Sequence, residues 1–283
     1  MTAAPVTPDA ADARDAAASG LFAADLALAL RLADAADAVT MARFDAADLE
    51  IDVKPDATHV TEADLATERA IRAILGSERP DDGIFGEEYG AEGSTHRQWI
   101  IDPIDGTANY LKGIPMWATL IALAVDGVPQ VGVVSQPALG RRWWGATGSG
   151  AWTATDAGPR RLGVSSVDTL AEASISFQSI QQWDEVGRLD QLVALTRTVW
   201  RDRGYGDAWP YMLLAEGRLE FVAEFGVKEY DIAPMFPIIA EAGGRVTAID
   251  GSASLSDRSV LATNGALHDA FLGAVARAEG TAP

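Results

Sequence analysis

One stretch of sequence decides the fold and points to the chemistry of this chain: residues 99–107 read Trp-Ile-Ile-Asp-Pro-Ile-Asp-Gly-Thr. Its apolar start is typical of a buried β-strand, and the strand runs into a turn that holds two carboxylates. Pro103 stiffens that turn, so the carbonyl of Ile104 can face the same point as both carboxylates. Two carboxylates and a carbonyl favour the binding of a hard cation. The alternative is an ordinary Asp-Pro turn, which is a common loop element.

Groups that match such a site occur next to this turn and in three other segments. Gly106 permits close backbone approach, and the N–H groups after it could open a helix, whose N-terminus attracts a phosphate. Gly86-Glu87-Glu88 follows a short apolar run, and residues 54–64 offer a cation, a hydroxyl and a carboxylate. Asp231 stands at the predicted start of a helix, where a carboxylate could equally be only an N-cap.

The composition limits which metals and partners the chain can take. Among the 283 residues there is no cysteine, and the three histidines are far apart in sequence. A metal site must therefore use oxygen ligands, which indicates magnesium, manganese or calcium. The net charge of -19 argues against binding nucleic acid or an anionic membrane. We see neither a signal peptide nor a membrane span, and we expect a cytoplasmic protein.

The apolar pattern predicts an α/β protein with two halves. Residues 1–20 lack large apolar side chains and predict a flexible tail. Residues 21–160 read as an α+β half, and the alternating strands and helices of residues 161–283 read as an α/β half. The elements that we expect in the first half are a helix from Leu21 to Phe44, a helix capped by Thr61 and ended by Gly76, and a hairpin over 119–134. Those expected in the second half are strands at 174–177 and 219–223 and helices at 189–197, 208–216 and 232–242.

Four segments taken in chain order resemble the motifs of the inositol monophosphatase superfamily: residues 54–64, 86–88, 102–107 and 230–231. The resemblance covers roughly residues 25–275. The resemblance implies a layered αβαβα sandwich of the inositol monophosphatase/fructose-1,6-bisphosphatase type, with the metal site between its halves. It also implies a homodimer and two or three Mg²⁺ ions. The implied ligands are Glu87, Asp102 and the Ile104 carbonyl for one ion, and Asp102, Asp105 and Asp231 for the second. A third, weaker ion would lie near Glu87.

The same resemblance implies roles for the remaining groups. Thr107 and Asp64 would orient the attacking water, and Lys54 would add positive potential or fix a metal-bound water. The residues expected at the substrate are Gly106, Thr107, Asp105, Asp207, Glu224 and Asp231. A water that attacks phosphorus in line needs no covalent phosphoenzyme.

Within the superfamily, several stretches look most like the histidinol-phosphatase branch. They are residues 119–126, 132–145, 206–207, 213–218 and 228–231. Tyr230 stands where inositol phosphatases more often have Trp, but Glu229 departs from the branch, which usually has Pro there. Histidinol phosphate carries an ammonium, which Asp207 or Glu224 could pair with. Carboxylates also bind sugar hydroxyls, so these two residues do not distinguish a histidinol phosphatase from an inositol phosphatase.

Two further readings stay open beside a histidinol phosphatase. One is an inositol-1-monophosphatase or a related small-molecule phosphatase, and the other is a non-catalytic phosphate or metal sensor on the same fold. The glycine-rich residues 145–150 resemble a nucleotide-binding loop. They lie between apparent strands without opening a helix, so we interpret them as a hairpin turn.

Overall fold

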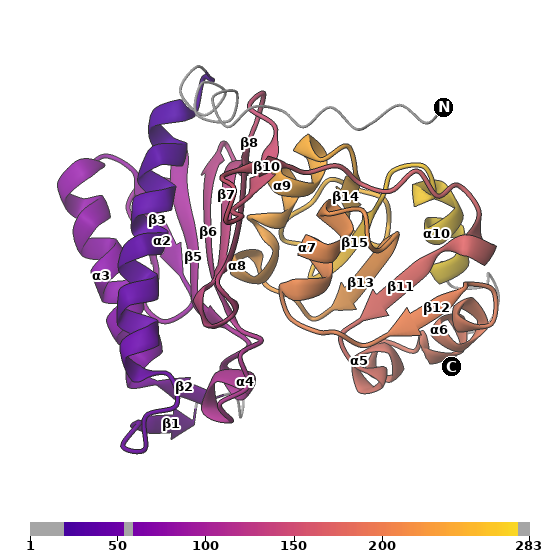
Figure 1. The fold of residues 1–283 in the computed structure, drawn as a ribbon, viewed down its shortest axis with the longest axis horizontal. Coiled ribbons are helices and arrows are strands. Elements are labelled where there is room, and N and C mark those ends of the chain that lie inside the picture. Colours follow the sequence, from indigo (N-terminus) through magenta and orange to yellow (C-terminus); the bar gives the residue numbers. More distant parts are fainter. Residues whose placement is uncertain (1–19, 54–58, 277–283) are drawn as a thin grey trace.

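The computed structural model describes residues 20–53 and 59–276. Two large sheets and the helices between and around them form an αβαβα sandwich (Figure 1). The predicted tail at residues 1–20 lies almost wholly outside the described residues, and so does Lys54.

The first sheet has eight strands in the order β10-β9-β8-β7-β6-β5-β3-β4. Neighbouring strands are antiparallel except for β3 and β5, which are parallel. Their bounds are β3 Gly83–Gly86, β4 Gly90–Glu92, β5 Arg97–Asp105, β6 Ala118–Val125, β7 Val128–Gln136, β8 Arg141–Ala146, β9 Ala151–Thr153 and β10 Arg160–Arg161. A separate pair, β1 (Ile51–Val53) and β2 (His59–Thr61), precedes them, and α4 (Thr107–Leu111) follows β5.

Helices cover both faces of this sheet (Figure 1). The outer face contacts α2 (Ala23–Arg43) and α3 (Glu62–Glu78). The inner face contacts α8 (Glu229–Ile232) and α9 (Met235–Glu241). Because both faces are buried, β6 reads Ala-Thr-Leu-Ile-Ala-Leu-Ala-Val without polar alternation. Leu120 of β6 packs in the inner core, while Ile121 packs in the outer core.

Two glycines let the inner helices approach the sheet closely. A Cβ on Gly132 would lie 2.3 Å from the carbonyl oxygen of Pro234, and one on Gly145 would lie 3.1 Å from the Cα of Ile238. Side chains at either position would push α9 away from β7 and β8. The short helix η1 (Pro137–Leu139) joins these two strands.

The second sheet has five strands in the order β12-β11-β13-β15-β14. Strand β11 is parallel to both of its neighbours, and the other pairs are antiparallel. Helices α5, α6 and α10 pack on its outer face, and α7 and α9 on its inner face. The bounds are η2 Leu170–Glu172, β11 Ser174–Phe177, α5 Ile180–Glu185, α6 Leu189–Thr196, β12 Arg201–Arg203, α7 Trp209–Ala215, β13 Phe221–Phe225, β14 Arg245–Thr247, β15 Ser259–Thr263 and α10 His268–Val275.

Most of the predicted elements are confirmed, and the errors lie at their ends. Helix α3 begins at the predicted Thr61 cap, but it continues past Gly76 to Glu78. The helix predicted over residues 232–242 is α9, but it begins three residues later, at Met235, because α8 ends at Ile232 and Pro234 precedes α9. A proline lacks the N–H of a helix interior, and its ring clashes with the preceding turn. Residues 145–150 join β8 to antiparallel β9, as the hairpin interpretation predicts.

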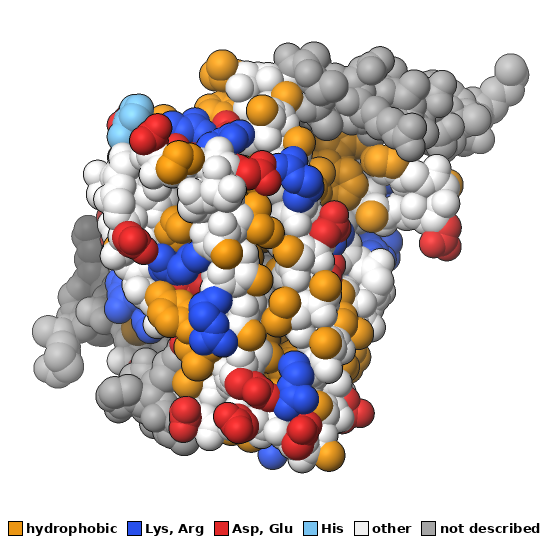
Figure 2. Space-filling model, turned by 90° about the vertical axis from the view of Figure 1, so that its left-hand side faces the viewer, with side chains coloured by type: hydrophobic (Ala, Val, Ile, Leu, Met, Phe, Trp, Pro, Cys, Tyr) orange, Lys and Arg blue, Asp and Glu red, His pale blue; other side chains and the backbone are white. Residues whose placement is uncertain are grey.

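The outer face of α2 and α3 carries acidic and basic side chains side by side (Figure 2). Several of them pair, such as Arg31 with Glu78 and Arg72 with Glu92. Among the described helices, none is both long and apolar enough to cross a membrane.

Candidate active site

The motif at residues 99–107 forms the end of β5 and the turn into α4. Pairing with β6 shifts register between Asp102 and Asp105, so the chain bulges there. The carboxylate of Asp102 is only 2% exposed and accepts a hydrogen bond from the Ile104 N–H at 3.0 Å. Thr119 donates its hydroxyl to the Pro103 carbonyl at 2.8 Å, which anchors the bulge to β6. These bonds hold the Asp102 carboxylate and the turn that leads to Asp105 in place.

Glu87 comes next to this turn because β3 and β5 are parallel neighbours. The carboxyl ends of parallel strands meet at the same edge of a sheet. The N–H of Glu87 donates to the carbonyl of Ile101 at 3.1 Å, one residue before Asp102. The sheet therefore brings together two acidic segments that lie apart in the sequence.

Asp64 reaches the site from the first turn of α3. Its Oδ2 accepts bonds from the N–H of Thr61 at 2.8 Å and from the Thr61 hydroxyl at 2.6 Å, which completes a capping box. Its Oδ1 lies 3.5 Å from the Thr107 hydroxyl, which also donates to the Ile104 carbonyl at 3.0 Å. The predicted pair of Thr107 and Asp64 is thus formed in the structure.

Asp231 enters from the second half of the chain on α8, which packs against β5 and β6. Its Oδ2 accepts the N–H of Lys228 at 2.7 Å. It lies in the third helical position, so it caps the helix from inside the first turn rather than from the N-cap position. This carboxylate has a capping role, but it also lines the cavity described next.

A cavity of about 310 Å³ lies between the two halves and collects these groups. Its lining residues are His59, Glu87, Asp102, Ile104, Asp105, Gly106, Thr107, Ala108, Asp207 and Asp231. Five of them carry carboxylates, and none is Lys or Arg. Among the residues that the structure describes, no three acidic or imidazole side chains lie in positions that could hold a metal ion without moving. The five carboxylates, together with the Ile104 carbonyl, fit a hard cation such as Mg²⁺.

Burial, and then repulsion between neighbouring charges, raises the pKa values of several carboxylates in this region. Burial raises the pKa of Asp102 well above its usual value, and the charges of Glu87 and Asp105 raise it further. Burial likewise raises the pKa of Asp64 to about 6 and that of Asp231 to about 6. Such shifts indicate that the negative charge of these carboxylates is not fully compensated by the protein. A bound cation would supply the missing compensation.

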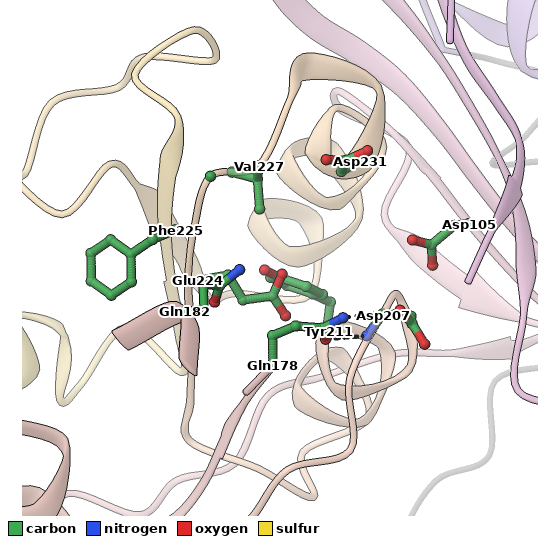
Figure 3. A pocket seen from close by; sticks show the side chains of 10 residues that line it. Asp105, Gln178, Gln182, Asp207, Tyr211, Glu224, Phe225, Val227 and Asp231 are labelled. Atoms are coloured by element: carbon green, nitrogen blue, oxygen red, sulfur yellow. Dashed lines mark hydrogen bonds between the residues drawn. The ribbon is translucent and has the colours of Figure 1, made fainter. Parts of the chain in front are cut away.

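A smaller pocket of about 130 Å³ adjoins this cavity and shares Asp105, Asp207 and Asp231 with it. The side chains of Glu224, Tyr211 and Gln182 converge on it (Figure 3). Within the described part of the chain, Oε1 of Gln182 is buried without a hydrogen-bond partner, and the Tyr211 hydroxyl faces the buried Glu224 carboxylate. Burial and the charge of Asp207 raise the pKa of Glu224 to about 8. The pocket therefore offers acceptors and negative charge to a ligand that brings donors.

Asp207 is held between the two halves in a backbone conformation that L-residues rarely adopt, with φ of 52°. Its Oδ2 accepts the side-chain amide of Asn109 at 2.8 Å, and its Oδ1 accepts that of Gln178 at 3.1 Å. The N–H of Asp207 donates to Gln178 at 2.7 Å (Figure 3). The carboxylate is thus fixed at the junction of the two pockets.

The structure places nine of the predicted site residues around these two adjoining pockets. They are Glu87, Asp102, Ile104, Asp105, Gly106, Thr107, Asp207, Glu224 and Asp231. Asp64 joins them through Thr107. Sequence reasoning missed Gln178, Gln182 and Tyr211, because nothing local in the sequence distinguishes an amide or phenol that lines a pocket from one on a surface.

Comparisons with known proteins agree with this fold. The sequence profile of the inositol monophosphatase family matches residues 23–279. The chain is 54% identical to a histidinol-phosphatase of Mycobacterium tuberculosis over 250 residues, which cover 88% of this chain and 96% of the relative. It is 51% identical to a histidinol-phosphatase of Streptomyces coelicolor over 254 residues, again 88% of this chain and 96% of the relative.

A solved structure of an inositol monophosphatase from Zymomonas mobilis superposes with a TM-score of 0.79 at 33% identity. The match covers 90% of this chain and 99% of that one. Family profile, relatives and fold agree over nearly the whole described chain, and the chain belongs to the inositol monophosphatase family.

Proposed function

We propose that this chain is a Mg²⁺-dependent phosphomonoesterase that hydrolyses L-histidinol phosphate to L-histidinol and phosphate, a reaction of histidine biosynthesis. One observation carries the proposal most directly: five carboxylates and the Ile104 carbonyl line a single cavity beside Thr107. Substrate identity rests on the relatives at 54% and 51% identity, which are histidinol-phosphatases. An inositol-1-monophosphatase is the alternative within the family.

In this proposal, two groups of oxygen atoms hold the magnesium ions. Glu87, Asp102 and the Ile104 carbonyl would hold one ion, and Asp102, Asp105 and Asp231 would hold another. A third, weaker ion would lie near Glu87. When bound, Mg²⁺ lowers the pKa of water and neutralises charge on the phosphate and the leaving oxygen.

The chain's own residues would orient the reactants. The Thr107 hydroxyl, next to Asp64, is placed to hold a water for attack in line on phosphorus. The N–H groups of Gly106 and Thr107 open α4 and would bind phosphate oxygens. Lys54, which lies outside the described residues, would add positive potential. The water attacks phosphorus directly, so no phosphoenzyme forms.

The smaller pocket would receive the histidinol part of the substrate. An ammonium brings three donors and a positive charge, and Glu224 and Asp207 offer acceptors and negative charge. In a buried site, such a charge-assisted pair is stronger than a hydrogen bond between neutral groups. Inositol would leave the negative charge of the pocket uncompensated.

The direct test is Mg²⁺-dependent release of phosphate from L-histidinol phosphate. We expect turnover with Mg²⁺, none after chelation with EDTA, and a loss of about a thousandfold or more in Asp102→Asn. Asp126→Asn is the matched control, because Asp126 is 73% exposed on a hairpin turn. Wild-type protein that binds Mg²⁺ and phosphate without turnover would indicate the non-catalytic sensor instead.

We also propose that the protein is a homodimer in the cytoplasm. Each chain would consist of two halves, residues 21–160 and 161–283. A surface that could support the dimer surrounds Trp200, which is 68% exposed and borders a pocket of about 560 Å³ beside Tyr205 and Trp209. Light scattering at micromolar concentration tests the dimer. A monomer would contradict it, and Trp200→Ser should weaken a dimer that uses this surface.

A further inference from the structure

Glu68 is a fully buried carboxylate that the proposed reaction does not use. It lies on α3 with no exposed surface, one helical turn after Asp64. Residues four apart share a face of a helix, so α3 presents both carboxylates toward the same region. An ionised carboxylate with no solvent contact must have compensating donors.

Its donors come from the loop that carries Glu87. Strands β3 and β4 pair as a hairpin in which Gly86 lies opposite Gly90, which leaves Glu87, Glu88 and Tyr89 as the loop. The N–H of Glu88 donates to Oε2 of Glu68 at 2.8 Å, and the N–H of Tyr89 donates to Oε1 at 3.2 Å. One carboxylate therefore binds two consecutive backbone donors directly after Glu87.

Arg72 completes this arrangement from the next turn of α3. Its Nε donates to Oε1 of Glu68 at 2.8 Å, and its Nη2 donates to the carbonyl of Gly90 at 2.5 Å. The loop is thus held at Glu88 and Tyr89 by the carboxylate and at Gly90 by the guanidinium. Bonds to an ionised partner are shorter and stronger than neutral ones, so the clamp restrains the loop firmly.

Gly86 is the residue that lets the clamp close. A Cβ at this position would lie 2.0 Å from Oε1 of Glu68 and 2.2 Å from its Cδ. The carboxylate thus occupies the space of the missing side chain. Gly86 in Gly86-Glu87-Glu88 is explained by this contact, since its backbone φ is not in the left-handed region.

We propose that Glu68 is the positioning residue for Glu87: it clamps the hairpin loop so that the Glu87 carboxylate points at the metal site, and it thereby sets the affinity for Mg²⁺. The inference rests on the proposed role of Glu87 as a metal ligand. Groups that orient metal ligands affect metal affinity by about 10–100-fold when they are lost. Glu68→Gln should therefore weaken Mg²⁺ binding by about that factor, because its NH₂ group faces N–H donors where the carboxylate accepted them.

The experiment measures Mg²⁺ binding by calorimetry on the purified full chain, together with the Mg²⁺ concentration for half-maximal activity. The variants are Glu68→Gln, Glu87→Gln and Glu216→Gln. Glu216 is the matched control, because its side chain is only 1% exposed and pairs with Arg141 and Arg218 away from the cavity. We expect Glu68→Gln to raise both the Mg²⁺ dissociation constant and the half-maximal concentration at least tenfold, with a kcat near wild type once Mg²⁺ saturates. Glu216→Gln should leave both unchanged.

Three results would overturn the inference, the last of them by removing the proposed ligand set on which it rests. Mg²⁺ binding unchanged in Glu68→Gln but weakened in Glu87→Gln removes the positioning role and keeps the metal site. Equal weakening in Glu68→Gln and Glu216→Gln means a general loss of stability. No effect of Glu87→Gln would instead refute the proposed ligand set. If Glu68→Gln does not fold, Arg72→Gln decides in its place, because it loosens the same loop from a less buried position.

Discussion

The hydroxyl of Thr107 lies 3.5 Å from Oδ1 of Asp64, although 43 residues separate them in the chain. The capping box at the start of α3 fixes Asp64, and the turn after β5 fixes Thr107. Two ordinary local structures thus meet to form a pair that can hold a water. Because local hydrogen bonds fix both side chains, folding itself orders the pair.

Thr107→Val should lower kcat by about 10²–10⁴-fold, because the attacking water loses the hydroxyl that orients it beside Asp64. Its KM should change little. Thr196→Val is the matched control, since the Thr196 hydroxyl also bonds the carbonyl three residues earlier, but on an exposed helix surface. Steady-state kinetics measures both variants. A Thr107→Val enzyme within threefold of wild type would exclude the hydroxyl from the reaction.

Gly106→Ala should abolish most of the activity and destabilise the fold. Gly106 has φ of 82°, and a Cβ there would lie 3.1 Å from the Met116 carbonyl and 3.2 Å from Oδ2 of Asp207. Gly127→Ala is the control, because it introduces the same backbone strain without a steric contact. Gly127 has φ of 78°, and no atom lies within 4 Å of a Cβ there. Each should lose about 1–2 kcal/mol of unfolding free energy, but only Gly106→Ala should lose activity. Equal activity in both variants would refute the role of this turn.

Glu224→Gln and Asp207→Asn should reduce kcat/KM for histidinol phosphate at least tenfold more than for p-nitrophenyl phosphate. The generic ester has no ammonium, so it loses no ion pair. Competition between the two substrates in one assay measures the ratio directly. Equal losses on both substrates would assign these carboxylates to the metals or to the fold.

His268 should make the protein less stable in mild acid. The ring is 1% exposed, and its two nitrogens lie 3.1 Å from the Thr247 hydroxyl and 2.9 Å from the Thr263 hydroxyl. Burial lowers the pKa of His268 to about 4 from the usual 6.5. The unfolded chain therefore binds more protons between these two values, and stability falls as the pH drops through that window.

Because of this histidine, the free energy of unfolding should be about 2 kcal/mol lower at pH 5 than at pH 7.5. Urea unfolding of wild type and His268→Gln at both pH values measures the difference, with His96→Gln as the exposed control. On acidification, the free energy of unfolding of His268→Gln should fall by about 2 kcal/mol less than that of wild type. Identical losses in wild type and His268→Gln would show that His268 titrates normally in the folded protein.

Local chemistry explains what the sequence alone could predict. The Thr61 cap, the hairpin over 119–134 and the strand and turn at residues 99–107 each depend on neighbouring residues, and each is formed as expected. The boundary of β13 was displaced by two residues, because its burial depends on β11 and β15 rather than on its own pattern.

Contacts between distant segments could not be predicted in the same way. The bonds of Asp207 to Asn109 and Gln178 span 98 and 29 residues. His59 lies on β2 and lines the larger cavity, although nothing in its local sequence distinguishes it from a surface histidine. Such relations follow from the arrangement of the sheets, which no local pattern encodes.

The central claim is tested most directly by kcat/KM for L-histidinol phosphate and for inositol monophosphate, measured on the same preparation with saturating Mg²⁺. We predict that histidinol phosphate is preferred by at least about a hundredfold, or about 2.7 kcal/mol in transition-state stabilisation. One desolvated pair between the substrate ammonium and Glu224 or Asp207 can supply that difference. A ratio near one, or a preference for inositol monophosphate, would contradict the claim.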